Sequence, residues 1–462
     1  MRYDYNYNVV VGLRKRFQKQ KKLKRRKAKK NRRNKMTKKI VIGAAMLALA
    51  ASSLAAKPAQ GKVLNIYVWN DEFSSRFKDY YEANNPKLLQ GVKVNFVQTP
   101  NQGNAYQDKL DEALLAQESA KADEKIDLFL VEADYALKYV DTPYTLDVMK
   151  DVGLKKKDLA EQFKYTQDIM TDSKGKLKGV SWQGCPGGFV YRRSYAKAVL
   201  GTDDPAKVQA QLSDWAKFDA VAAKMKAAGY FMLSGYDDDF RVFQDNVKSP
   251  WVKGNKIVID PQINAWIEQT KKYTDAGYNN KASLWSAEST AGMMKDGKVF
   301  GYFGPAWYVD FCMPHDEGSA FGDWAFCQGP QGYSWGGTWI CAAAGTDNID
   351  LVRDIMYKLT CDKDNMIALA KGAGDFANNK AAMEEVAKSD YKNDFLGGQN
   401  HMAFFIGSAG SIDKSKITKY DQAMNEKIQA AMKDYYDGVV DLDTAWENFY
   451  TAVLEVYPNL KR

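Results

Sequence analysis

The chain has 462 residues, of which 45% are hydrophobic and 27% are charged. At about 150 residues per domain this length allows two or three domains, and the composition excludes a disordered, collagen-like or coiled-coil chain. Two histidines, His315 and His401, are too few for a multi-histidine metal site. The sequence has no Cys-x-x-Cys, Walker A, His-Glu-x-x-His or Gly-x-Gly-x-x-Gly motif, so we expect neither a metal nor a cofactor.

The basic residues are concentrated at the N-terminus. Residues 1–39 contain 18 of the 66 basic residues and one of the 57 acidic ones, so the rest of the chain carries a net charge of −8. The basic run at 21–33 permits one alternative, a nucleic-acid-binding arm. A basic stretch at 36–39, an apolar run at 40–51 and small residues ending at Ala56 then follow, which are the three regions of a secretory signal in order. We therefore expect export, cleavage near Ala56 and no nucleic-acid partner.

The apolar run is too short to anchor the chain. It has 12 residues, whereas about 20 are needed to span a bilayer. Leu54-Ala55-Ala56 is similar to the start of a bacterial lipoprotein signal, but Lys57 stands where the lipidated cysteine would follow, so no lipid anchor is expected. Five cysteines enter an oxidising compartment, and their odd number leaves at least one unpaired within a monomer. Their pairing stays open.

The first third of the exported chain alternates between strand and helix patterns. Apolar runs or alternation predict strands at 64–69, 92–96 and 126–131, and helical spacing predicts helices at 70–84 and 106–117. This β-α-β-α-β order, with right-handed crossovers, indicates half of a doubly wound parallel sheet. In such sheets ligands bind beyond the carboxyl ends of the strands.

Each of these three strands is followed by polar or aromatic residues. The segments are 69–72, 98–102 and 132–135, and we expect them to meet at one edge of the sheet. A plainer interpretation is that Asn70 or Asp71 only caps the helix that follows.

The remainder of the chain continues the α/β pattern. Strands are predicted at 180–184, 189–191 and 299–303, and helices at 209–229, 260–277, 286–296 and 416–457, the last with a break at Gly438. Asp214 fits a helix cap and Gly277 a helix end.

Two catalytic patterns occur in this sequence. Residues 332–336 match Gly-x-Ser-x-Gly, but no strand precedes them and no helix follows, so a nucleophilic role for Ser334 is not expected. Glu132, Asp134 and the run Asp237-Asp238-Asp239 could supply the two carboxylates of a glycosidase, which lie about 5–9 Å apart across the scissile bond.

The aromatic content is high, at 13%, with 11 tryptophans. Pyranose rings have one apolar face and a rim of hydroxyls, so their sites combine flat aromatic side chains with polar groups. Several tryptophans stand at strand ends or beside glycines: Trp69, Trp182, Trp307, Trp335 and Trp339. Core packing is the expectation for Trp215, Trp266, Trp324 and Trp446.

From Leu64 to Pro458 the order of features resembles the extracellular solute-binding proteins of carbohydrate ABC importers, the maltose-binding-protein-like family. The resemblance rests on segments such as VLNIYVWNDEF, IDLFLVEADY, GMMKDGKVFGYFGPAW and GGTWICAAAGTDNID. It implies the two-lobe periplasmic-binding-protein fold, in which doubly wound α/β sheets are joined by a three-segment hinge. Lobe 1 would comprise 57–182 and 338–374 and lobe 2 would comprise 183–337 and 375–462, with crossings near Trp182, Gly337 and Gly374.

The resemblance also implies a sugar site and a function. Its contacts fall on Trp69, Asn70, Glu72, Glu132, Asp134, Trp182, Trp307 and Trp335, while Asp237 and Arg241 are added for their charge alone. The expected protein is a monomer without catalysis that captures an oligosaccharide and delivers it to a membrane permease. Two alternatives remain open: a secreted glycoside hydrolase using paired carboxylates, and an adhesin or nucleic-acid-binding protein that keeps its basic leader.

Overall fold

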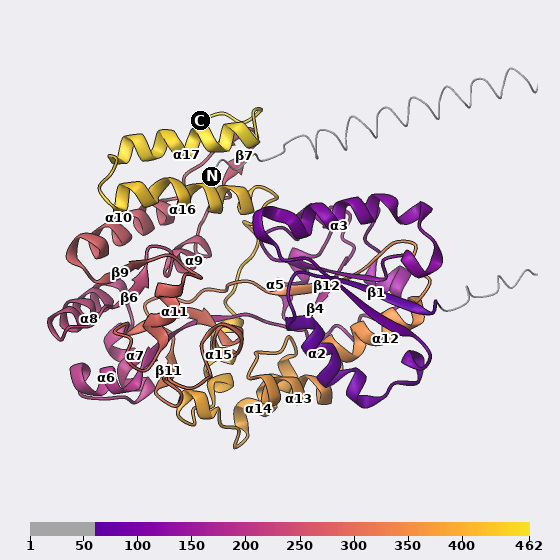
Figure 1. Cartoon of the computed structure of the whole chain (residues 1–462), viewed down its shortest axis with the longest axis horizontal. Helices are drawn as coiled ribbons and strands as arrows, with labels where there is room; N and C mark the ends of the chain where they lie inside the picture. Colours follow the sequence, from indigo (N-terminus) through magenta and orange to yellow (C-terminus); the bar gives the residue numbers. More distant parts are fainter. Residues whose placement is uncertain (1–60) are drawn as a thin grey trace, which may run out of the picture.

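The computed structural model describes residues 61–462. The predicted leader and signal at 1–56, the cleavage near Ala56 and the argument from Lys57 lie outside the described residues. Figure 1 shows two lobes side by side along the long axis, with the N-terminal strands in the right-hand lobe and the middle of the chain in the left-hand lobe. Later segments return to both lobes, so each lobe is built from separate stretches of sequence.

The first lobe is built on a five-stranded sheet. Its order is β2 (Lys93–Gln98), β1 (Val63–Val68), β3 (Leu128–Glu132), β12 (Thr338–Ala342) and β4 (Val180–Ser181). β1 is parallel to β2 and β3, whereas β12 is antiparallel to β3 and β4. Helices α2 (Glu72–Tyr80) and α3 (Ala105–Ala116) connect the parallel strands, which confirms the predicted β-α-β-α-β unit.

Further helices complete this lobe. They are α4 (Leu137–Val140), the π-helical η6 (Val148–Val152), α5 (Lys164–Ile169), α12 (Ile349–Thr360) and α13 (Lys363–Ala373), with short 3-10 turns η1 (Glu82–Asn84), η2 (Lys87–Leu89), η3 (Gln102–Asn104), η4 (Gln117–Ser119) and η5 (Ala122–Glu124). Helix α13 packs against α2, and Figure 1 shows both on the lower side of the right-hand lobe.

The second lobe contains smaller sheets. Its largest has the order β10 (Gly301–Pro305), β5 (Gly187–Arg192) and β11 (Trp324–Cys327), all antiparallel. Strands β6 (Leu233–Gly235) and β9 (Asn279–Ala282) form a parallel pair, and β7 (Val252–Lys253) and β8 (Lys256–Ile257) form a hairpin.

The helices of the second lobe surround these sheets. They are α6 (Arg193–Leu200), α7 (Pro205–Leu212), α8 (Trp215–Ala227), α9 (Phe240–Gln244), α10 (Pro261–Ala276), α11 (Ala287–Met293), the π-helical η7 (Tyr308–Cys312), α14 (Lys380–Lys388), the 3-10 turn η8 (Asp394–Leu396), α15 (His401–Ala409), α16 (Asp421–Tyr436) and α17 (Leu442–Val456). The break expected at Gly438 is confirmed, since its φ of 73° separates α16 from α17.

Two predicted elements differ from the structure. The stretch 209–229 is not one helix, because Asp214 begins a new one: its side chain accepts from the Lys217 amide at 2.8 Å and starts α8. The strand expected at 180–184 ends after Ser181, because residues 182–184 leave the sheet and bond to residues 376–378 instead.

The hydrophobic core has two parts. The larger cluster fills both lobes around the main sheets, and the smaller one lies between α10, α16 and α17. Trp266 and Trp324 are fully buried, as expected, whereas Trp215 and Trp446 are only partly buried. Within residues 61–462 no helix has both the length and the apolar character that crossing a bilayer requires.

Three segments connect the two main sheets. They run from β4 to β5, from β11 to β12 and from α13 to α14. Backbone hydrogen bonds tie them together: the Asn378 amide donates to the Trp182 carbonyl at 2.7 Å, and the Gly187 amide donates to the Tyr333 carbonyl at 2.8 Å. The three connections therefore lie side by side between the lobes.

Candidate functional site

One cavity of about 620 Å³ brings most of the predicted site residues together. Its lining includes nine of the ten: Trp69, Asn70, Glu72, Glu132, Asp134, Asp237, Arg241, Trp307 and Trp335. The tenth, Trp182, is outside the lining. Its side chain is 1% exposed and its ring packs against Phe73 at a centroid distance of 5.3 Å, so it forms part of the core behind α2.

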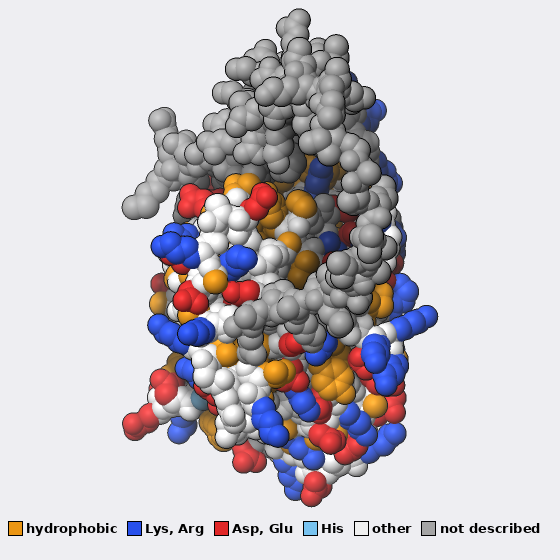
Figure 2. Space-filling view, turned by 90° about the vertical axis from the view of Figure 1, so that its right-hand side faces the viewer, with side chains coloured by type: hydrophobic (Ala, Val, Ile, Leu, Met, Phe, Trp, Pro, Cys, Tyr) orange, Lys and Arg blue, Asp and Glu red, His pale blue; other side chains and the backbone are white. Residues whose placement is uncertain are grey.

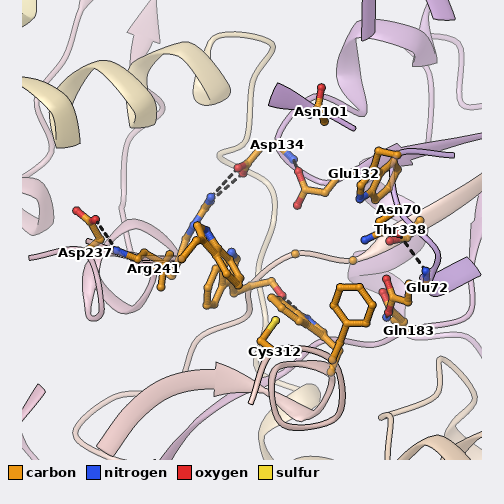
Figure 3. A pocket seen from close by; sticks show the side chains of 18 of the residues that line it. Asn70, Glu72, Asn101, Glu132, Asp134, Gln183, Asp237, Arg241, Cys312 and Thr338 are labelled. Carbon is orange, nitrogen blue, oxygen red and sulfur yellow. Dashed lines mark hydrogen bonds and ion pairs between the residues drawn. The ribbon is translucent and has the colours of Figure 1, made fainter. Parts of the chain in front are cut away.

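The first lobe supplies polar groups from the ends of its parallel strands. Asn70 and Glu72 follow β1, Asn101 follows β2, Glu132 is the last residue of β3, and Asp134 follows it. These exits converge because parallel strands end at the same edge of a sheet. Of the two residues considered as helix caps, Asp71 is the N-cap of α2 but makes no side-chain capping bond, whereas the side-chain oxygen of Asn70 accepts from the amide of Glu72, the first residue of α2, at 3.2 Å. Figure 3 shows these residues on one side of the cavity.

An ion pair crosses the cavity from this polar edge. Both carboxylate oxygens of Asp134 accept from the guanidinium of Arg241 on α9, at 2.8 and 2.6 Å (Figure 3). Burial opposes ionisation of Asp134, but the charge and hydrogen bonds of Arg241 outweigh it and lower the pKa of this carboxyl. Burial and the charge of Asp134 raise the pKa of neighbouring Glu132. The pKa values of these two neighbouring carboxyls are therefore shifted in opposite directions.

A second polar network surrounds the carboxyl of Glu72. The side-chain amide of Gln183 donates to the carboxylate of Glu72 and, at 3.0 Å, to that of Asp375. Burial, and next the charge of Asp375, raise the pKa of Glu72 to about 8. Arg76 lies near both acids and pairs with Asp310 of η7 at 2.8 Å. Since α2 and η7 belong to different lobes, this is a second ion pair between them.

The second lobe supplies most of the aromatic side chains of the cavity. Trp307 follows β10 and its indole nitrogen donates to the Trp335 carbonyl at 3.2 Å. The two rings lie 5.1 Å apart in an edge-to-face arrangement, and the Arg241 guanidinium lies 5.8 Å from the Trp335 ring. Asp237 accepts from the Leu284 amide at 3.3 Å, and burial raises its pKa. The cavity is therefore lined by both ring surfaces and hydrogen-bond acceptors.

Some lining residues were not predicted. They are Asn101, Gln183, Leu284, Trp285, Phe311, Cys312, Gly336, Gly337, Thr338, Glu426 and Gln429. Trp285 could have been predicted from the sequence, since it stands in a segment of mostly small and polar residues, ASLWSAEST, outside any long apolar run. Glu426 and Gln429 had none, because a helix face that lines a wet cavity has the same polar composition as one that faces solvent.

The Gly-x-Ser-x-Gly segment has a structural role. Ser334 is buried, and both its hydroxyl and its amide donate to Asp245, at 3.0 and 2.7 Å. Asp245 also pairs with Lys414. His315 bonds to the Val309 carbonyl and His401 to the Gly374 carbonyl, so neither contacts Ser334 by a side-chain hydrogen bond within the described residues. This serine holds the β11–β12 connection in place.

Among the described residues, the cysteines form no disulfide and the acidic groups form no metal site. All five cysteines are free thiols, and four of them are buried. In the part of the chain that the structure describes, no three His, Cys, Asp or Glu side chains are grouped as a metal site would require.

The two α/β lobes, their triple connection and the cavity between them define a binding protein of the periplasmic type. The chain belongs to the bacterial extracellular solute-binding proteins, whose family model matches residues 76–395. No relative among the curated proteins matches the sequence.

Solved structures share this fold at low sequence identity. An extracellular solute-binding protein of family 1 has a TM-score of 0.69 and 18% identity, covering 85% of this chain and 99% of that one. The ABC-transporter-associated binding protein of B. animalis subsp. lactis Bl-04, solved with β-1,6-galactobiose, has a TM-score of 0.66 and 17% identity, covering 87% and 99%. The galacto-N-biose/lacto-N-biose I-binding protein of Bifidobacterium longum, solved with lacto-N-biose, has a TM-score of 0.65 and 16% identity, covering 86% and 98%.

Proposed function

We propose that this protein is the sugar-binding component of an ABC importer, which captures an oligosaccharide between its lobes and delivers it to a membrane permease. One observation carries the proposal: a single cavity is lined both by tryptophan rings, most of them from the second lobe, and by carboxylate and amide groups from both lobes. This combination matches the apolar face and hydroxyl rim of a pyranose. The sugars named for the similar structures support the same ligand class.

The ligand contacts in this proposal are the nine cavity-lining residues predicted above, without Trp182. Asn70 and Glu132 bond sugar hydroxyls, and Trp307 stacks on a ring face. The lobe boundaries remain as predicted, 57–182 with 338–374 and 183–337 with 375–462, and the three connections act as the hinge on which the lobes close. The protein acts as an exported monomer whose signal is removed near Ala56.

The glycoside-hydrolase alternative has less support. A hydrolase needs two carboxyl groups on opposite sides of the scissile bond. Glu132 and Asp134 come from the same strand end, and Asp134 gives both oxygens to Arg241. Asp237 lines the cavity from the second lobe, but its carboxylate accepts from the Leu284 amide. The face shown in Figure 2 also offers little to a nucleic acid, because on its part that is not grey, basic and acidic side chains are intermixed without a large basic field.

Calorimetric titration of the exported protein with neutral disaccharides and trisaccharides tests the proposal. We expect saturable binding, a smaller radius of gyration by X-ray scattering when sugar is bound, and recovery of the sugar intact. Release of shorter sugars would instead support the glycoside-hydrolase alternative. Intact-mass analysis of the exported protein gives the cleavage site, and a retained basic leader would contradict removal near Ala56.

A further inference from the structure

Two aromatic side chains at the cavity are exposed to solvent. Trp285 is 61% exposed and Phe311 is 44% exposed, and both line the same cavity as Trp307. An exposed tryptophan leaves a large apolar surface in water, which is unfavourable unless something covers it. The position of Trp285 at the edge of a ligand cavity indicates that a ligand is what covers it.

The backbone holds Trp285 in an uncommon conformation. Its φ is 68°, in the left-handed region that bulky residues rarely adopt. Both neighbours are fixed: the Leu284 amide donates to Asp237 at 3.3 Å, and the Ser286 side chain accepts from the Ser289 amide at 3.2 Å to begin α11. Strain of this kind persists where surrounding contacts impose it and is frequent at ligand clamps.

Three indoles form a row along the cavity. Trp307 lies 5.1 Å from Trp335, and Trp335 lies 5.8 Å from Trp285. Trp335, in the middle, is the most buried at 8%, Trp307 is partly buried, and Trp285 is the most exposed at 61%. The ring of Trp285 also lies 6.1 Å from Tyr308, which supports it from the side of η7.

We propose, resting on the function proposed above, that Trp285 forms an outer sugar subsite. The inner ring of an oligosaccharide stacks on Trp307, and a later ring of the same chain stacks on Trp285, with the carboxylate of Asp237 beside it to accept hydroxyl hydrogen bonds. The ligand is therefore a neutral sugar of at least three units, bound with one end toward solvent, and Trp285 selects for chain length.

The test compares ligand length across matched variants. The wild-type protein, Trp285→Gly, Trp285→Phe and Trp307→Ala are titrated with β-1,6-galactobiose, maltose and their three- and four-unit homologues. Trp285→Gly suits this backbone, since glycine adopts positive φ without strain, so the fold is retained. Phe321→Ala is the control, because Phe321 is also exposed, at 55%, but does not line the cavity.

We expect Trp285→Gly to lower affinity about tenfold for the longer sugars and less than about twofold for the disaccharides. Trp285→Phe should retain most of the length preference, and Trp307→Ala should weaken sugars of every length. If Trp285→Gly weakens the affinity equally for sugars of every length, or leaves it unchanged, the outer subsite is overturned, whereas the proposed sugar-binding function still stands. Failure of the wild-type protein to bind any of these sugars would overturn both proposals.

Discussion

The carboxylate of Asp134 and the guanidinium of Arg241 face each other across the cavity and share two hydrogen bonds, at 2.8 and 2.6 Å. Asp134 follows β3 of the first lobe, and Arg241 belongs to α9 of the second. Arg76 of α2 and Asp310 of η7 form a second ion pair between the two lobes. Both pairs favour the arrangement in which the lobes enclose the cavity.

Loss of Arg241 should therefore weaken sugar binding through the closed arrangement. Arg241→Ala leaves Asp134 without its partner, and we expect a loss of about 1.5–3 kcal/mol, roughly ten- to hundredfold in affinity, by calorimetry. The unliganded variant should also show a larger radius of gyration by X-ray scattering.

Arg462→Ala is the matched control for this variant. Arg462 makes the same two-bond pair with Glu447, at 2.6 and 2.6 Å, but on the exposed C-terminal surface. Exposed pairs contribute little, so its removal should leave affinity and radius unchanged. Equal effects of the two variants would contradict a role for Asp134–Arg241 between the lobes.

Trp307→Ala should separate recognition from packing. If Trp307 stacks on the ligand, the variant loses about 1.5–3 kcal/mol of binding, roughly ten- to hundredfold in affinity, with a small change in melting temperature. Trp266→Ala provides the comparison, because Trp266 is fully buried and its truncation should cost about 3–5 kcal/mol of stability. A large drop in melting temperature for Trp307→Ala with unchanged affinity would show that its role is packing.

The strand exits could be predicted because their position follows from topology. Asn70, Glu72, Glu132 and Asp134 each follow a strand that the hydrophobic pattern identifies, and parallel strands end at one edge. Trp182 has the same local pattern, yet its side chain turns into the core, since the two-residue β4 ends before it. A pattern of residue types does not specify which face of the chain a side chain occupies after a strand ends.

Other parts of the site depend on contacts far apart in sequence. Gln183 joins Glu72 to Asp375, which is 192 positions away from it, because the connecting segments pair between the lobes. Trp285 has a positive φ, which no spacing of apolar residues indicates. These features arise from tertiary packing and could not be read from local periodicity.

Glu72 should make stability depend on pH in the opposite sense to a surface carboxylate. Its pKa rises from 4.5 to about 8 on folding, so the folded state holds its proton more tightly than the unfolded state. The contribution of Glu72 to the free energy of unfolding is fully present below about pH 4.5 and is lost as the pH rises to about 8. The groups facing it, Asp375, Arg76, Gln183 and Asp310, belong to α2, η7 and the connecting segments.

Denaturant unfolding from pH 4.5 to pH 8, the window set by Glu72, tests this prediction. Glu72→Gln should flatten the decline in the free energy of unfolding. Glu385→Gln is the control: its exposed carboxylate pairs with Lys363, which lowers its pKa, so this substitution should not flatten the decline. If the free energy of unfolding declines equally with pH in the wild-type protein and in Glu72→Gln, Glu72 does not hold its proton more tightly in the folded state.

Ser334→Ala should separate structure from catalysis at the Gly-x-Ser-x-Gly segment. The hydroxyl of Ser334 donates to Asp245 in a buried site next to Lys414, so its removal should cost about 1 kcal/mol of stability. Sugar affinity should stay within about twofold of the wild-type value, because Ser334 does not line the cavity. Denaturant unfolding measures the first effect, titration the second, and chromatography of the recovered sugar detects cleavage. Cleavage by the wild-type protein that disappears in Ser334→Ala would identify a nucleophile and contradict the binding-protein assignment; intact sugar from both proteins is the outcome that the contacts of Ser334 with Asp245 lead us to expect.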